Sequence, residues 1–348
     1  MFYKCSKCGK NWQYPIGKCP DCFCSLERRP SRKVKVIGAS QSKVPTIMHP
    51  ETPYFVLVLE DQNGNRWVQK TTKEHKIGDY FSVEPVKNKD GVAIWRVKYD
   101  PLEAIEKIIE LIGGIKIDPQ DEIIILPTLI APKHPYFASN TSPEFLDALL
   151  QYLKKQGACP EKIKVVAQSF DQIPIEASVQ KSKILDVCLS HQINLLDLSK
   201  GKFIEKNGYQ ISEEAFRSDL IINLPILKLD RRAGIKGASE NSLVFLKKES
   251  YLSLKEDNSA SEKIPEIVQK ILPNHLTIAD CQNIQKSNGF TVFAGLALAG
   301  FNPLNLDRIF AEICLEKNLP KYLEKIRIED IDVAGRTVEE LRYDLSHF

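Results

Sequence analysis

The spacing of the N-terminal cysteines constrains the fold more than any other feature of the sequence. Five of the nine cysteines in the 348-residue chain lie between Cys5 and Cys24. Cys5 and Cys8 form one Cys-x-x-Cys pair, and Cys19 and Cys22 form a second pair after ten intervening residues. Two such pairs can surround one metal ion with four thiolates. A segment of about 20 residues with few large apolar side chains cannot form a core unaided, so we expect the metal to supply its folding energy.

This metal site is expected to be structural. Four thiolates leave no open position for water or substrate, which favours one structural zinc ion per chain. Iron in a rubredoxin-like site is compatible with the same ligands. A redox-active pair is disfavoured because such motifs need a βαβ context. Cys24 receives no role. The other cysteines are expected to be buried as small apolar side chains: Cys159, Cys188, Cys281 and Cys314.

The composition is that of an ordinary globular protein. The hydrophobic fraction is 43%, the charged fraction is 27%, and the formal net charge of +3 does not by itself indicate a nucleic-acid partner. No apolar run approaches the roughly 20 residues that cross a bilayer, and the N-terminus lacks the core of a signal peptide. We therefore expect a cytoplasmic protein of two or three domains with no membrane association.

Residues 31–100 have the pattern of short β-strands. The Asn63-Gly64 pair predicts a hairpin with a type I′ turn. About five strands in this length indicate a small closed barrel such as an OB-fold. The expected strands are "RKVKVIGAS", "PYFVLVLED", "RWVQKTT", "DYFSVEPV" and "VAIWRVKYD".

Aromatic side chains in this segment allow two interpretations. As stacking platforms beside lysines they would favour binding of single-stranded nucleic acid. As apolar filling of a small barrel they would be structural, and the nearly neutral charge favours this second interpretation. The residues concerned are Trp67, Tyr80, Phe81 and Trp95, with Lys70, Lys73 and Lys76.

The cysteine spacing followed by "TPYFVLVLEDQNGNRW" and "HKIGDYFSV" resembles the zinc-ribbon and OB-fold proteins of domain of unknown function 35, over roughly residues 1–100. Members of that family are typically small partners of thiolase-like and other acyl-coenzyme A enzymes. The resemblance implies a rubredoxin-like zinc ribbon over residues 1–30 and an OB-fold barrel over residues 31–100 that together dock a partner enzyme. It implies no catalytic residue.

The remainder of the chain alternates between strand and helix patterns. Residues 101–118 read as a linking helix that stops at Gly113-Gly114. Over residues 119–348 the alternation predicts an α/β domain with a mostly parallel sheet and helices on both faces. The expected strands are "EIIILPTLI", "KIKVVAQ", "NLLDL", "DLIINLP" and "LTIADC", and the expected helices are "TSPEFLDALLQYLKKQG", "ASVQKSKILDVCLSHQ" and "LNLDRIFAEICLEKN".

Ligands of such sheets bind beyond the carboxyl ends of the strands. No Gly-x-Gly-x-x-Gly or Walker motif follows a strand here, which disfavours a standard nucleotide enzyme. Clustered Lys and Arg side chains after "DLIINLP" can clamp a carboxylate or phosphate, although a basic loop can also be merely solvated. Asp280 ends a strand as a candidate acid/base, metal ligand or helix cap. The candidate ligand-binding residues are Lys228, Asp230, Arg231, Arg232, Lys236 and Asn241.

Six stretches resemble domain of unknown function 362, in order and over roughly residues 120–342. They are "LPTLIAP", "NTSPEFLDALLQYLKKQG", "SDLIINLPILKLD", "GIKGASEN", "LTIADCQN" and "LALAGFNPLNLDRI". The chain departs from the family pattern at Thr128, Asp230 and Ala238, where the family carries a Lys-Pro-Asn strand end, a histidine and a Lys-Asn pair. The iron–sulfur segment that some members append is also missing. If the family is enzymatic, these departures imply an altered or lost activity.

The sequence thus supports more than one function. In the first, the ribbon and barrel dock an enzyme of the thiolase-like or acyl-CoA class, while the α/β domain binds a small anionic ligand. In the second, the protein is an enzyme that acts on a small carboxylate or acyl thioester, with a basic clamp at residues 228–236 and Asp280 as acid/base. The third and weaker interpretation is nucleic-acid binding through the barrel.

Overall fold

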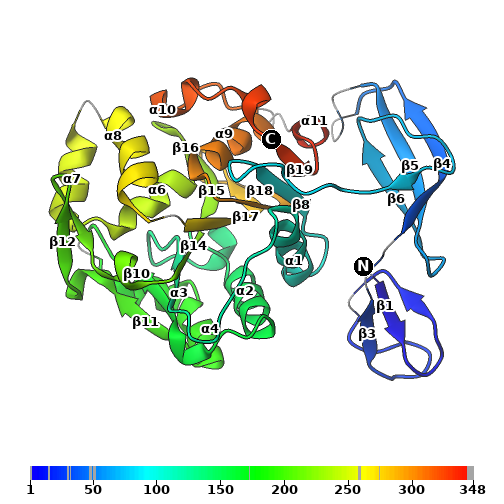
Figure 1. The fold of residues 1–348 in the computed structure, drawn as a ribbon, viewed down its shortest axis with the longest axis horizontal. Coiled ribbons are helices and arrows are strands. Elements are labelled where there is room, and N and C mark those ends of the chain that lie inside the picture. Colours follow the sequence, from blue (N-terminus) through cyan, green and yellow to red (C-terminus); the bar gives the residue numbers. More distant parts are fainter. Residues whose placement is uncertain are drawn as a thin grey trace.

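The structure is a computed structural model that describes residues 2–14, 16–29, 31, 33–46, 49, 52–171, 173–257, 260–273 and 275–342. Two small β-rich parts precede a large α/β domain (Figure 1). The first is a three-stranded antiparallel sheet in the order β2-β1-β3, here called the ribbon. Its strands are β1 (Phe2–Cys5), β2 (Asn11–Trp12) and β3 (Leu26–Arg29).

The second part, here called the strand module, is an antiparallel sheet in the order β6-β5-β4-β7. Its small core contains Val36, Leu57 and Leu59. The predicted β5–β6 hairpin is present, but its turn is not type I′, because Gly64 is left-handed (φ 76°) and Asn63 is not. Its strands are β4 (Val34–Ser42), β5 (Tyr54–Glu60), β6 (Arg66–Thr71) and β7 (Tyr80–Phe81).

The fifth strand that we expected in a barrel lies elsewhere. β8 (Val92–Arg96) is a strand of the large sheet, between β18 and β19. Val92, Ala93 and Ile94 are all fully buried, so the strand is apolar on both faces, as suits the middle of a sheet between helix layers. The expectation that the barrel extends to residue 100 is therefore wrong at β8, and within the described residues no fifth strand closes the strand module.

The large sheet has the order β11-β10-β9-β14-β17-β18-β8-β19, and β15 pairs with both β16 and β17. It is parallel from β11 to β17 and antiparallel across β18 and β8, so it is mixed. A separate hairpin joins β12 to β13. The strands not yet given are β9 (Ile123–Pro127), β10 (Ile163–Ala167), β11 (Asn194–Asp197), β12 (Phe203–Lys206), β13 (Tyr209–Ser212), β14 (Leu220–Leu224), β15 (Ile226–Asp230), β16 (Gly234–Lys236), β17 (His275–Gln285), β18 (Thr291–Gly300) and β19 (Val333–Gly335).

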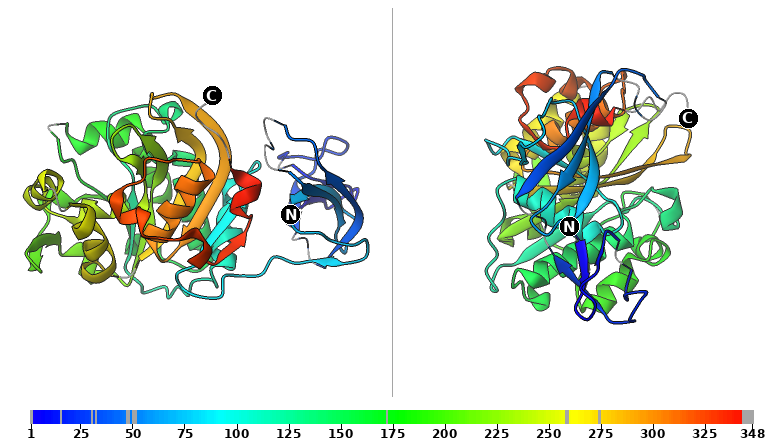
Figure 2. Two further views of the ribbon diagram at one scale, coloured as in Figure 1. Left: turned by 90° about the horizontal axis from the view of Figure 1, so that it is seen from above. Right: turned by 90° about the vertical axis from the view of Figure 1, so that its right-hand side faces the viewer.

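Helices cover both faces of this sheet, as predicted (Figures 1 and 2). The helices α1, α2 and α4 pack on one face, and α9 packs on the other. No helix in the described ranges is long and apolar enough to cross a membrane. The helices are α1 (Pro101–Leu111), α2 (Pro143–Lys155), α3 (Ile175–Lys181), α4 (Ile184–His191), α5 (Glu214–Arg217), α6 (Ala238–Ser242), α7 (Lys248–Glu256), α8 (Ala260–Glu266), α9 (Pro303–Ile313), α10 (Lys321–Glu324) and α11 (Val338–Leu341).

Two helices differ from their sequence-based expectation. The segment 101–118 is not a linker, because Ile105 and Ile108 of α1 are fully buried in the core that α1 shares with the sheet. Asp100 begins this helix by accepting a hydrogen bond from the N–H of Leu102 at 2.9 Å. The helix expected over "ASVQKSKILDVCLSHQ" is two helices, α3 and α4, separated at Lys183, whose φ is 63°.

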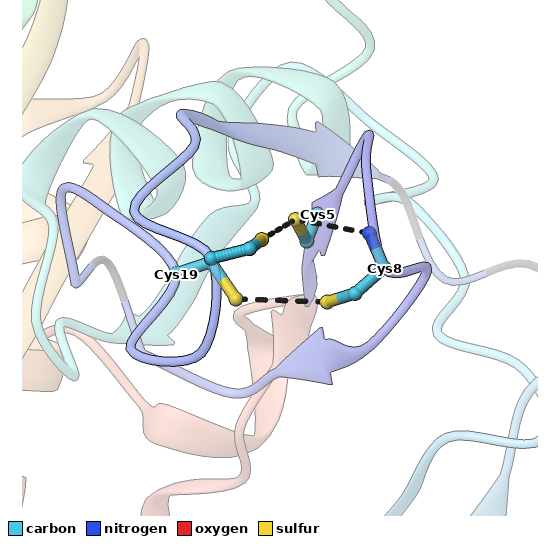
Figure 3. Close-up of side chains that lie close together, drawn as sticks. Cys5, Cys8 and Cys19 are labelled. Carbon is cyan, nitrogen blue, oxygen red and sulfur yellow. Dashed lines mark hydrogen bonds between the residues drawn. The ribbon is translucent and has the colours of Figure 1, made fainter.

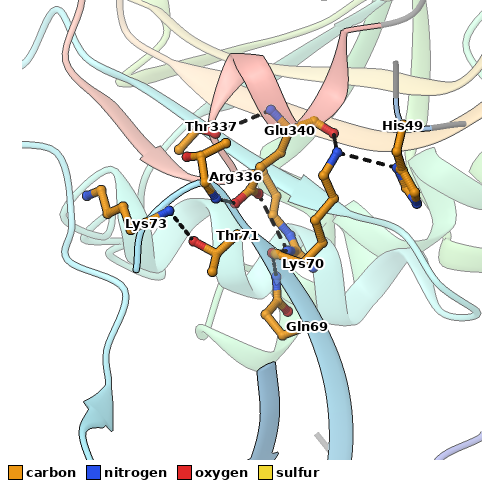
Figure 4. Close-up of polar contacts among 9 residues, drawn as sticks. His49, Gln69, Lys70, Thr71, Lys73, Arg336, Thr337 and Glu340 are labelled. Carbon is orange, nitrogen blue, oxygen red and sulfur yellow. Dashed lines mark hydrogen bonds and ion pairs between the residues drawn. The ribbon is translucent and has the colours of Figure 1, made fainter. Parts of the chain in front are cut away.

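Polar contacts join the two N-terminal parts to the α/β domain. Arg28 of the ribbon lies 3.2 Å from the carboxylate of Glu106 on α1. The Arg336 guanidinium donates to the carbonyl oxygen of Lys70 on β6 at 3.1 Å, and the Glu340 carboxylate accepts from the N–H of Thr72 at 3.2 Å (Figure 4). The strand module therefore contacts the end of the chain, more than 260 residues away in sequence.

Candidate functional site

A cavity of about 330 Å³ lies at the carboxyl ends of the parallel strands. The loops that follow β9 and β10, strand β15, the β16–α6 segment and α7 all contribute to its walls. The sheet therefore places a cavity where an α/β domain ordinarily binds its ligand. Lys228, Lys236 and Asn241, three of the predicted ligand-binding residues, line it.

Lys228 is the buried cation of this cavity. It is only 7% exposed, and its Nζ donates a hydrogen bond to the carbonyl oxygen of Ser139 at 3.2 Å. In the part of the chain that the structure describes, no carboxylate lies within ion-pair distance of this Nζ. Burial, and then the nearby charge of Lys236, lowers the pKa of Lys228 to about 8.

Lys236 faces Lys228 across an antiparallel strand pair, but it has a counterion. The β15–β16 register places the two lysines opposite each other, and Lys236 Nζ lies 3.0 Å from the Asp230 carboxylate. Asp230 also closes the turn, because its Oδ1 accepts from the N–H groups of Arg232 and Ala233 at 2.9 Å each. Partial burial opposes ionisation of Asp230, yet these hydrogen bonds and the Lys236 ammonium lower its pKa to about 2.

The structure does not bring every predicted residue to the cavity. Arg231 and Arg232 are exposed on the β15–β16 turn and are not part of its lining. Asp280, on β17, is 1% exposed and also does not line the cavity. Its Oδ2 accepts from the N–H of Ser142 at 3.1 Å, where α2 begins, and burial raises its pKa. Asp280 lies inside β17 rather than at its end, and β18 follows, so the predicted strand-end position and cap of the next helix are wrong. Its carboxylate instead supports the start of the earlier helix α2.

Asn241 has a structural role in the cavity wall. Its side-chain amide donates to the Leu126 carbonyl oxygen at 2.9 Å and to Asn223 Oδ1 at 2.7 Å, and its Oδ1 accepts from the Thr128 hydroxyl at 2.9 Å. The Thr128 hydroxyl also accepts from the N–H of Ile226 at 3.2 Å. This buried network joins the ends of β9 and β14 to α6.

Asp307 is a site-supporting residue that the sequence analysis missed. It is fully buried on α9, and its two oxygens accept from the N–H groups of Ala238 at 2.7 Å and Ser239 at 2.9 Å, at the start of α6. A Cβ at Gly237 would lie 2.2 Å from Asp307 Oδ1, so only glycine permits this approach. Burial raises the pKa of Asp307 to about 6 against these hydrogen bonds. The sequence does contain one indication of this role: Asp307 is an acidic residue next to Leu306 on the apolar face of a helix, where a carboxylate needs hydrogen-bond donors.

Part of the cavity lining is apolar. The rings of Phe170 and Tyr251 stack with centroids 3.8 Å apart and an interplanar angle of 6°. Val244 and Leu252 lie on the same lining, whereas Glu240 is ion-paired with Lys255. The cavity can thus accommodate a ligand with an anionic end and an apolar body.

The four predicted cysteine ligands come together in the ribbon (Figure 3). All four Sγ atoms lie within 4.8 Å of one another, with 3.2 Å between those of Cys5 and Cys22 and 3.6 Å between those of Cys8 and Cys19. Thiolates around a tetrahedral ion with metal–sulfur bonds of about 2.3 Å lie about 3.8 Å apart, so the cluster fits one metal ion. Cys24 is outside the cluster.

The remaining cysteines are free thiols away from this cluster. Cys188, Cys281 and Cys314 are buried, as expected, and Cys159 is half-buried.

A larger cavity of about 850 Å³ lies between the ribbon, the strand module and α1. The four aromatic residues that we considered as stacking platforms line it: Trp67, Tyr80, Phe81 and Trp95. The lysines considered with them, Lys70, Lys73 and Lys76, do not. The lining carries both acids and bases, among them Glu103, Glu110 and Lys98. The aromatic residues therefore gather where the three parts of the chain meet.

The ribbon should contain one metal ion per chain, which elemental analysis of the purified protein measures. Cys8→Ser and Cys19→Ser should each reduce the metal content and unfold the ribbon, because a small segment without a core depends on its metal. Cys24→Ser is the matched control, since this neighbouring thiol lies outside the cluster. Retention of the metal in Cys8→Ser, or its loss in Cys24→Ser, would contradict the assignment.

Asp307 should make stability depend on pH. Its folded-state pKa of about 6 exceeds the ordinary 3.8, so its stabilising contribution is complete below about pH 4 and is lost as pH rises through about 6. The free energy of unfolding of the wild type relative to Asp307→Asn should therefore fall by on the order of 3 kcal/mol between about pH 4 and pH 7. Denaturant unfolding at each pH measures it. The exposed Asp186→Asn is the control, and identical pH profiles for wild type and Asp307→Asn would refute this role.

Comparison with curated proteins gives no match. Among solved structures, the chain is similar to the lactate racemase apoprotein from Thermoanaerobacterium thermosaccharolyticum, with 14% sequence identity and a TM-score of 0.40. This similarity covers 65% of this chain and 57% of that chain, so this chain spans little more than half the length of that protein.

A protein-family model matches a long continuous part of the chain. Residues 123–312 match the family described as Domain of unknown function (DUF362). The match includes none of residues 1–122, so the relation of the ribbon and strand module to domain of unknown function 35 stays a prediction. Because the matched residues make up more than half of the 348-residue chain, this protein belongs to the family described as Domain of unknown function (DUF362).

Proposed function

We propose that the α/β domain binds a small organic anion in the cavity at the carboxyl ends of its strands. Lys228 carries this proposal: within the described residues no carboxylate pairs with its buried ammonium, which is costly, and a bound anion would supply the missing charge. Lys236 would bind the same anion from the facing strand. The stacked rings of Phe170 and Tyr251 would contact the apolar body of the ligand.

The proposed anion site uses only two of the four basic residues that the sequence predicts for it. Lys228 and Lys236 line the cavity, whereas Arg231 and Arg232 do not. An enzyme that uses Asp280 as acid/base is less well supported, because Asp280 does not line the cavity and its carboxylate accepts hydrogen bonds from Ser142 and Gln282. The ligand class that we propose is therefore a carboxylate with a branched or aromatic body.

We further propose that the ion of the ribbon is a structural zinc. Four thiolates and no water position are the usual set for structural zinc, and iron would use the same ligands. The metal would then hold the ribbon, whose Arg28 pairs with Glu106, against α1 without taking part in chemistry at the cavity.

Binding of simple carboxylates, such as phenylacetate and 4-methylpentanoate, tests the first proposal. Isothermal titration calorimetry should show affinity that falls as pH rises through about 8, because Lys228 then loses its proton. Lys228→Gln should weaken binding about 10- to 100-fold, as expected when a charged hydrogen bond is lost. Arg231→Gln is the matched control, because this cation lies outside the cavity. Equal loss in both variants, or no dependence on Lys228, would reject the proposal.

A second candidate function is docking of a partner enzyme by the ribbon and strand module. The observation that favours it is apolar exposure on the strand module: Val68, Ile77 and Tyr80 are 65%, 69% and 70% exposed. Partner surfaces commonly carry such residues. The partner class that we propose is a thiolase-like or other acyl-CoA enzyme.

Affinity capture with identification of the bound protein tests this second function. Wild type should retain an acyl-CoA enzyme, and the double variant Val68→Glu with Ile77→Glu should lose it, because buried carboxylates in an interface are costly. Leu189→Glu is the control, since Leu189 is 67% exposed on α4, outside the strand module. Capture that is equal in all three proteins, or absent in the wild type, would rule the function out.

A further inference from the structure

We infer that Lys228 is an imine-forming residue and that the ligand class of the cavity includes 2-oxo acids. This inference rests on the proposed anion binding and adds a covalent step to it. An imine requires an amine nitrogen that is uncharged part of the time, is held in place, and faces a cavity large enough for a carbonyl compound. Lys228 meets each of these requirements.

The first requirement is met by the surroundings of the amine. Lys228 is 7% exposed, and its Nζ donates a hydrogen bond to the carbonyl oxygen of Ser139, which also limits its movement. The charged groups near it are Lys236 and Lys133, which disfavour its protonated form, and Glu240 and Asp230, which favour it. Asp230 is already ion-paired with Lys236, and Glu240 with Lys255.

The balance of these effects leaves a useful fraction of free amine. With a pKa of about 8, about a tenth of Lys228 is uncharged at pH 7. An ordinary lysine with a pKa of about 10.4 has well under a thousandth of its amine uncharged at that pH. Lowered pKa values caused by burial are the usual way in which a lysine becomes a nucleophile towards carbonyl groups.

The second lysine explains the preference for an acid. Lys236 lies opposite Lys228 in the strand register and keeps its charge beside the Asp230 carboxylate. In a 2-oxo acid the carboxylate and the carbonyl carbon are adjacent. We expect a carboxylate at Lys236 to bring the adjacent carbonyl carbon near Lys228, its cross-strand neighbour. Phe170 and Tyr251 on the same cavity lining offer apolar surface to the side chain of the acid.

The step balances without any further reactant. The lone pair of Lys228 Nζ forms a bond to the carbonyl carbon, and the π electrons of the carbonyl move to its oxygen. A proton passes from the nitrogen to this oxygen, which gives a carbinolamine. Loss of the hydroxyl with the remaining nitrogen proton releases one water molecule and leaves the carbon–nitrogen double bond of the imine. Hydrolysis by the reverse path restores the amine.

Reductive trapping tests the inference. The full-length protein is incubated with 4-methyl-2-oxopentanoate and cyanoborohydride, and the modified lysines are located by peptide mass spectrometry. We expect Lys228 to carry the reduced adduct at least about tenfold faster than any other lysine, as its larger fraction of free amine predicts. Lys236→Arg should retain the adduct on Lys228. Lys228→Arg should lose it while still binding 4-methylpentanoate, because an arginine keeps the charge but is never deprotonated.

The outcomes separate this inference from the proposed function. If wild type binds 4-methylpentanoate but trapping labels only exposed lysines, anion binding stands and the imine is rejected. If wild type binds no carboxylate at all, the proposed function itself fails. Because labelling is mapped on the wild-type protein, the test remains decisive even if Lys228→Arg does not fold.

Discussion

The polar groups at the ends of β9 and β14 lie away from water, and the rest of the site depends on how they are satisfied. The side-chain amide of Asn241 forms hydrogen bonds with the Leu126 carbonyl oxygen, the Asn223 side chain and the Thr128 hydroxyl. Leaving one of these buried polar groups unpaired would cost about 1–3 kcal/mol of folding free energy. The hydrogen bonds of Asn241 therefore hold α6 against the sheet. The cavity wall that includes Asn241 is a consequence of this network.

Hydrogen bonds of buried polar groups also connect the cavity wall to α9. The start of α6 presents backbone N–H groups that need acceptors, and Asp307 supplies both oxygens from a helix on one face of the sheet. Gly237 is required where the two segments meet. The strand pair that carries Lys228 and Lys236 leads directly into this segment. The position of the cations thus depends on a buried carboxylate that never faces the ligand.

Much of this arrangement could be predicted from the sequence, and the errors have physical causes. The cysteine spacing predicts the metal cluster because it reflects local geometry, and the apolar runs of β9 and β14 predict buried strands. The segment "VAIWRV" predicts a strand but not the sheet that contains it, because a short apolar strand has the same pattern in the strand module and in the large sheet. Proximity in sequence predicts that Arg231 and Arg232 share a site with Lys228, but both arginines lie on the β15–β16 turn and are exposed to solvent. Asp307 was missed because its partners lie 68 and 69 residues away along the chain.

We propose that the cavity lined by Lys228, Phe170 and Tyr251 binds an anion. A crystal structure of the whole chain with a bound aliphatic carboxylate tests this claim most directly. We expect the carboxylate to lie within hydrogen-bond distance of Lys228 Nζ or Lys236 Nζ, with its apolar body against the stacked rings. A carboxylate bound at Arg231, or between the ribbon and α1, with no ligand at Lys228, would contradict it.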